Sequence, residues 1–242
     1  MFQKYVYKLE QLCDRYMEVM LAELREMCVE RLIGYVQMDE ASWWWSRHDV
    51  RRHAVESSAT PSLSRCLPFF QRCRTALRMQ LNHDLFDVLW WRLTEHVDRV
   101  VYEGVVRRGG YHFRDVGVEQ LRVDYQRLTE CFQPSNNNNI NDDDDAAAAA
   151  AAATTVVSFP LLHETLVIFS WDPMELEQLV DVLYSLRGGG REEDEEGGSE
   201  CTYDEDRETN VEIQQMHDVL MTKGIRVMHP LQVLYVSSLR LQ

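Results

Sequence analysis

Apolar residues recur at steps of three and four positions along most of this chain, a spacing that places them on one face of an α-helix. The first such stripe predicts one long amphipathic helix over residues 3–38. Its members are Val6, Leu9, Leu12, Cys13, Tyr16, Met20, Leu24, Met27 and Cys28. No stretch alternates apolar and polar residues between hairpin turns, as strands would require. The sequence therefore predicts an all-α protein.

Two further stripes predict long helices in the middle of the chain. The second stripe is expected to end near residues 109–110, and its members are Leu81, Leu85, Val88, Leu89, Leu93, Val97, Val100 and Val101. The third has Asp115 placed to cap it, and its members are Val116, Leu121, Tyr125, Leu128 and Phe132. The two adjacent tryptophans of the second stripe, Trp90 and Trp91, point in different directions on a helix. One is expected to pack in the core and the other to lie at a seam between helices.

Prolines and glycines mark the expected helix ends. Pro173 follows Asp172 and precedes Glu175, which is the order of N-cap, first-turn proline and acid at a helix start. Gly224 suits a left-handed helix end, and Pro230 suits the start of the next helix. All six prolines are expected at the edges of helices, namely Pro61, Pro68, Pro134, Pro160, Pro173 and Pro230.

Negative charge is concentrated in two low-complexity segments. The 242 residues include 25 Lys+Arg and 40 Asp+Glu, a net charge of −15. Without residues 142–145 and 188–210, the chain holds 23 basic and 26 acidic residues. Residues 134–154 and 188–210 offer no apolar face, so both are predicted to be disordered loops between helices. The nearly neutral remainder has no cluster of basic residues, so nucleic acid is not expected as the main partner.

The cysteines and the most apolar segment bear on the compartment. The six cysteines lack the short repeated spacings of a disulfide framework or a zinc site, which favours a reducing compartment. Five of them are expected on apolar helix faces, as small buried hydrophobic residues. Residues 154–171 form the most apolar stretch, but it is broken by Pro160, His163 and Glu164 and is shorter than the roughly 20 apolar residues of a spanning helix. Any membrane association is expected to be peripheral.

No motif of catalysis or cofactor binding is present. The triple glycine at residues 188–190 is followed by acids that would repel phosphate, and neither a Gly-x-Ser-x-Gly elbow nor a His-Glu-x-x-His helix occurs. His48 and His53 lie on different helix faces, and Cys66 and Cys73 are farther apart than paired zinc ligands. We therefore expect no catalytic, cofactor-binding or metal-binding residue.

Two local features leave alternatives open. His163 and Glu164 could form an acid–base pair, although exposed polar positions at a helix start are the simpler interpretation. Residues 43–45 are three consecutive tryptophans, which suit either a membrane or partner anchor or a connector packed onto the neighbouring helices.

Five blocks of residues, in this order, resemble the C-terminal region of the RINT/Tip family of vesicle-tethering subunits. The first two blocks are Leu67-Pro68-Phe69-Phe70 and Leu85-Phe86-Asp87-Val88-Leu89-Trp90 followed by Tyr102-Glu103. The third block is Phe113, Gly117, Gln120-Leu121 and Asp124, with one extra residue between Phe113 and Gly117 relative to the family pattern. The last two are Phe159, Leu162, Glu164, Leu166 and Leu183, and then Leu220, Gly224-Ile225, Pro230 and Val233-Leu234. The resemblance covers roughly residues 41–240.

This resemblance implies a non-enzymatic subunit of the ER tethering complex called NRZ, or Dsl in fungi, which acts in retrograde Golgi-to-ER transport. Its implied partners are Zeste-white-type and NAG-type tether subunits and ER SNAREs, with the protein cytoplasmic and peripheral on the ER membrane. No cofactor is implied. Family members are several times longer, so the chain is expected to be a fragment or truncated product. A helical adaptor in checkpoint signalling and a small helical enzyme with an unrecognised site are the alternatives.

The implied fold is a series of antiparallel helical bundles that form a rod-like, CATCHR-type C-terminal region. Residues 1–38 are expected to end a preceding bundle, and residues 39–133 to form a helical bundle. Beyond the insert at 134–154, residues 155–242 are expected to form the C-terminal bundle, which contains the acidic loop 188–210.

Overall fold

The computed structural model describes residues 2–37, 58–107, 113, 115–133, 159–188 and 205–240. Every regular element in these ranges is a helix, which confirms the all-α prediction. The elements are α1 (Phe2–Val36), α2 (Pro61–Gln80), α3 (His83–Val101), the π-helix η2 (Tyr102–Arg107), α4 (Asp115–Phe132), α6 (Pro160–Ser170), α7 (Pro173–Gly188), α8 (Glu205–Thr222) and α9 (Pro230–Arg240).

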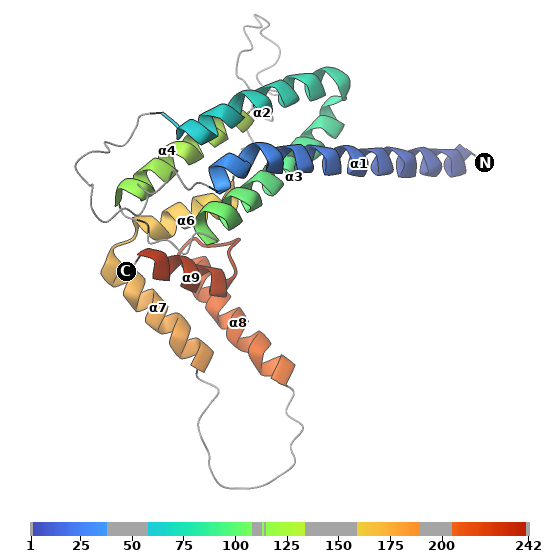
Figure 1. The fold of residues 1–242 in the computed structure, drawn as a ribbon. Coiled ribbons are helices and arrows are strands. Elements are labelled where there is room, and N and C mark those ends of the chain that lie inside the picture. The colour runs from blue at the N-terminus through green and yellow to red at the C-terminus, as the bar shows by residue number, and fades with distance from the viewer. Residues whose placement is uncertain are drawn as a thin grey trace, which may run out of the picture.

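The helices pack in two groups that share α6 (Figure 1). In the first group α1 packs against α2 and α3, and α4 packs against α2. In the second group α7, α8 and α9 pack against one another. Helix α6 contacts α3 and α4 on one side and α9 on the other. The rod-like stacking and the predicted bundle boundaries stay predictions.

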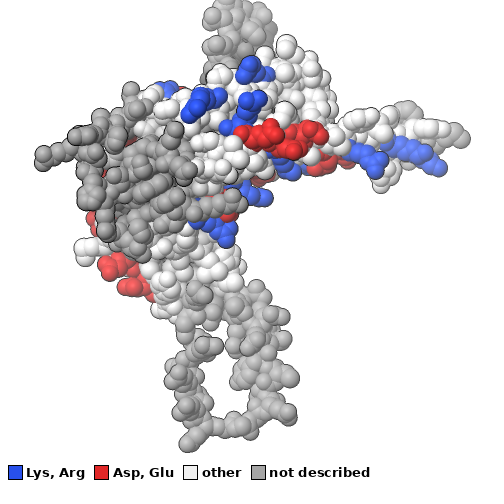
Figure 2. Space-filling model, viewed as in Figure 1, with Lys and Arg blue, Asp and Glu red and all other residues white. Residues whose placement is uncertain are grey.

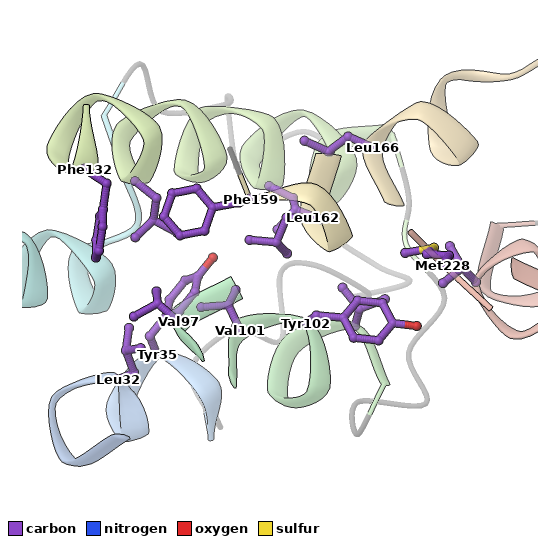
Figure 3. Close-up of a cluster of buried hydrophobic side chains, with 14 of the residues drawn as sticks. Leu32, Tyr35, Val97, Val101, Tyr102, Phe132, Phe159, Leu162, Leu166 and Met228 are labelled. Carbon is purple, nitrogen blue, oxygen red and sulfur yellow. The ribbon is translucent and has the colours of Figure 1, made fainter. Parts of the chain in front are cut away.

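One continuous core joins these helices. Figure 3 shows Tyr35 of α1 facing Val97 and Val101 of α3, with Phe159 and Leu162 at the start of α6 beside them. All five side chains are fully or almost fully buried. Burying such side chains contributes about 1.5–3 kcal/mol each, so this cluster holds the first group against α6.

Several helix ends form as their sequences predict. The Asp172 carboxylate accepts a hydrogen bond from the Met174 N–H at 2.9 Å and so caps α7, with Pro173 as its first residue. Gly224 has φ 85°, the left-handed conformation expected after α8. Pro230 is the first residue of α9.

Pro68 is a correction, because it lies inside α2 and not at a helix edge. Proline has no N–H, so the interruption costs about 3 kcal/mol in a helix interior. Helix α2 continues through it because Leu63, Phe70 and Leu77, on both sides of the proline, are buried. Packing therefore outweighs the local preference.

The predicted acidic loop at 188–210 is also partly wrong, because α8 begins at Glu205. The insert at 134–154 lies outside the described residues. No helix in the described ranges is long and apolar enough to cross a membrane.

Candidate protein-interaction surface

Three carboxylates are buried between the helices, and they are the first residues to test for chemistry. Asp98, Asp124 and Glu164 are at most 5 % exposed. A buried acid with a shifted pKa is a candidate catalytic group unless its environment explains it structurally. The hydrogen bonds of each acid show whether it is a candidate catalytic group or has a structural role.

Asp124 of α4 accepts hydrogen bonds from three other residues. The Tyr35 hydroxyl donates to Oδ2 at 3.0 Å, and the Thr60 N–H donates to Oδ1 at 2.8 Å. The Thr60 hydroxyl and the Gln120 amide complete the set at 3.0 and 3.2 Å. Burial raises the pKa of Asp124, and these four donors oppose that rise. The network ties α1 and the start of α2 to α4, and it leaves the carboxylate inaccessible to a substrate.

Asp98 of α3 holds the start of α6. Its two oxygens accept hydrogen bonds from the N–H groups of Leu161 and Leu162 at 2.8 and 3.1 Å. These N–H groups have no partner within the helix, because they lie in its first turn. Burial raises the pKa of Asp98 to about 7, with the nearby Glu164 carboxylate adding to the rise. The shift thus has a structural cause.

Glu164 of α6 binds the segment that leads into α9. Oε1 accepts from the N–H groups of Arg226 and Val227 at 2.7 and 2.8 Å, and Oε2 accepts from that of Met228 at 2.8 Å. The sequence interpretation placed Glu164 at an exposed position, and this is wrong. Because both oxygens are occupied by backbone donors, Glu164 is unavailable as a partner for His163, which is exposed.

The histidines and cysteines singled out in the sequence do not assemble into a site in the described residues. No group of three potential metal ligands occurs there. The Cys66 thiol donates to the Arg31 carbonyl at 2.9 Å and thereby links α2 to α1. Cys13 is exposed, which corrects its predicted burial on an apolar face. His48 and His53 lie outside the described residues.

Of the tryptophans, Trp90 is buried and Trp91 is 54 % exposed. The Trp90 indole stacks on Phe132 at 4.8 Å between ring centroids and donates to the Phe132 carbonyl at 3.0 Å. Trp90 packs as predicted, whereas the exposure of Trp91 does not fit the predicted seam. The tryptophans at 43–45 lie outside the described residues.

The surface best suited to a partner lies on the first half of α1, which projects from the rest of the protein (Figure 1). We call residues 3–16 the outer segment, and all of them are exposed. Within it, four large side chains at steps of four and three positions share one helix face. This outer stripe comprises Tyr5, Leu9, Leu12 and Tyr16, which are 53–67 % exposed. The predicted helix is confirmed, but its apolar residues are exposed up to Tyr16, and burial begins only at Met17 and Met20.

The rest of α1 buries a different face. Leu21, Leu24, Cys28 and Leu32 are buried where α1 packs against α2 and α3, and they lie roughly a third of a turn around the helix from the outer stripe. An exposed apolar face of this kind is typical of a binding site. The apolar stripe was visible in the sequence, but its periodicity does not show which of its residues are covered by other helices.

Comparison with known proteins gives one match. A model of the RINT-1/TIP-1 family matches residues 1–213 of the 242. No curated protein and no solved structure matches the chain. The sequence blocks described above span roughly residues 41–240, whereas the match reaches back to residue 1 and stops at residue 213. The outer segment therefore lies within the matched range, and α9 lies beyond it.

Proposed function

The chain belongs to the RINT-1/TIP-1 family of tethering subunits, and from that membership we propose that it serves as a non-enzymatic subunit of an ER vesicle-tethering complex in retrograde Golgi-to-ER transport. The observation that carries the proposal is the family match over residues 1–213. It covers most of the chain, including the long helix α1 and the first group of helices, and it extends through α6 and α7 into the first half of α8.

The environment of the buried acids supports a role in binding. Asp98, Asp124 and Glu164 each use both oxygens to hold the fold together. Burial in the fold raises the pKa values of Asp98 and Asp124, so a bound substrate is not needed to explain these shifts. A helical scaffold with an exposed apolar stripe is suited to protein contacts, in which a few aromatic and apolar anchors carry most of the energy.

The proposed partners are the other subunits of an NRZ- or Dsl-type complex, of the Zeste-white and NAG types, together with ER SNAREs. In this proposal the protein is cytoplasmic and is held at the ER membrane by its partners. The outer stripe is the part of the described surface on which we expect one of these contacts.

Co-precipitation of an endogenously tagged protein from detergent extract tests the proposal. We expect ER SNAREs and other tether subunits in the precipitate, and the tagged protein on the ER in intact cells. An untagged strain grown in parallel controls for adsorption to the beads. Recovery of neither class of partner, together with a nuclear or evenly soluble distribution, would refute the proposal.

A further inference from the structure

The outer segment of α1 has no neighbour among the described helices. Helix α2 ends at Gln80 and the chain turns into α3 at His83, so α1 continues alone beyond this hairpin (Figure 1). The outer stripe faces solvent over residues 5–16, a length of about 18 Å at 1.5 Å per residue. That length matches three turns of a partner helix, the usual scale of helix recognition through an apolar face.

Three basic residues border one flank of the outer stripe. Lys4, Lys8 and Arg15 each come immediately before a stripe residue, which places all three on the same side of the helix. Figure 2 shows basic side chains on the projecting part of α1. Glu10 lies on the other flank, and Asp14 lies on the face opposite the stripe. The two flanks of the stripe therefore differ in charge.

The basic flank is not neutralised by the described part of the chain. Neither Lys4 nor Lys8 has an acid three or four positions away, the spacing at which helix side chains pair. Arg15 has Glu18 at that spacing, but Glu18 forms a salt bridge with Arg92 of α3. An apolar stripe beside uncompensated positive charge is complementary to an apolar stripe beside negative charge.

We propose that the outer stripe binds an amphipathic helix of a partner protein, and that this helix carries acidic side chains on the flank facing Lys4, Lys8 and Arg15. The inference rests on the proposed function, because it names the chemistry of one protein contact of a tether subunit. A second copy of this chain fits less well, because its outer stripe is bordered by the same three basic residues and by one acid, Glu10. An anionic bilayer also fits less well, because the outer segment has three basic and two acidic residues, and segments that bind such bilayers carry roughly four to eight Lys or Arg.

Two synthetic helical peptides serve as probes. Both have leucine at the a and d positions of four heptads, and they differ only in carrying Glu or Lys at the flanking e and g positions. Binding to the full chain is measured by fluorescence anisotropy. We expect the Glu peptide to bind about threefold to tenfold more tightly than the Lys peptide. The preference is expected to weaken as salt is added.

Matched variants assign the preference to one flank. The triple change Lys4→Glu, Lys8→Glu and Arg15→Glu is expected to reverse it. The control Glu10→Lys with Asp14→Lys changes two acids that lie away from the basic flank, and it is expected to keep the preference for the Glu peptide. Leu9→Ser with Leu12→Ser is expected to abolish binding of both peptides, with circular dichroism showing that each variant is folded.

Several results would overturn the inference. Two of them concern the peptides: equal binding of the Glu and Lys peptides, or a preference that the triple reversal leaves unchanged. The other two are a dimer of the chain that Leu9→Ser with Leu12→Ser dissociates, and binding of the outer segment to phosphatidylserine vesicles. Recovery of ER SNAREs in the co-precipitation by both the wild type and the triple reversal would leave the proposed function standing while removing this inference.

Discussion

At the scale of single residues, the buried carboxylates connect segments that are distant in sequence. Asp98, Asp124 and Glu164 each accept backbone N–H groups from positions 62 to 64 residues away. A buried N–H without a partner costs about 1–3 kcal/mol, so each acid stabilises the approach of two elements whose donors would otherwise be unpaired.

Glu164→Ala tests this at the acid that accepts the most backbone N–H groups. The change leaves the N–H groups of residues 226–228 without their acceptor, and we expect the free energy of unfolding to fall by about 2–5 kcal/mol. Urea denaturation followed by circular dichroism measures it. Glu177→Ala removes an exposed acid from α7 and is expected to change stability by less than about 0.5 kcal/mol. Similar losses in the two variants would contradict the role assigned to Glu164.

Asp98 should give stability a specific pH dependence. Its pKa is about 7 in the folded protein against the ordinary value of 3.8 for aspartate, so the folded state holds the proton more tightly. The contribution of Asp98 to stability is therefore present below pH 4 and is lost as the pH rises to about 7. The difference in unfolding free energy between the wild type and Asp98→Asn should fall across this window by up to about 1.4 kcal/mol per pH unit and then level off. A difference that stays constant from pH 4 to 8 would show that Asp98 is not perturbed.

The sequence indicated which positions are polar, but it did not reveal their partners. Gln120 and Asp124 stand four positions apart within an apolar stripe, which marks them as unusual, and both are buried. Glu164 was expected to be exposed because it begins a helix. Its burial follows from the segment at residues 226–228, which no local pattern connects to it.

At the scale of helices, the long stripes predicted α1, α3 and α4 well because periodicity is a local property. The predictions from the sequence are wrong where tertiary packing outweighs the local preference of a residue. Pro68 stays inside α2 because the helix is buried on both sides of it. Helix α3 passes directly into the π-helix η2, which packs against the end of α1, so the helical run reaches Arg107, near the end expected at residues 109–110.

Gly104 of η2 lies against Val36 of α1 in that contact. A Cβ at this position would lie 1.9 Å from Cγ1 of Val36, so Gly104→Ala forces the two helices apart. We expect a loss of about 1–3 kcal/mol in unfolding free energy, measured by urea denaturation. Val36→Ala in the same chain removes both Cγ atoms and is expected to recover part of the loss.

The matched control is Gly34→Ala, two residues before Val36 in α1. A Cβ there has open space around it, and alanine favours helix over glycine by about 0.5–1 kcal/mol. Gly34→Ala is therefore expected to stabilise the protein. If Gly104→Ala and Gly34→Ala changed the free energy of unfolding in the same direction, the close contact between η2 and α1 would not explain the effect of Gly104→Ala.

At the scale of the whole molecule, α6 is the element on which both groups of helices depend. Asp98 of α3 caps its start, and Glu164 of α6 holds the segment before α9. Leu162 in the first turn of α6 is fully buried. Damage to α6 should thus reach both groups, whereas damage to α7 should stay within the second.

Hydrogen exchange with mass spectrometry of Leu162→Ala and Leu183→Ala tests this coupling. Both leucines are fully buried, so each truncation costs about 2–5 kcal/mol and the two variants are matched in chemistry. We expect Leu162→Ala to lower protection in α3 and α4 and in α7 and α9 together, because α6 contacts both groups. Leu183→Ala lies in α7 and is expected to lower protection mainly in α7, α8 and α9. If Leu162→Ala affected only one group, the two groups would be independent units, and α6 would belong to that group alone.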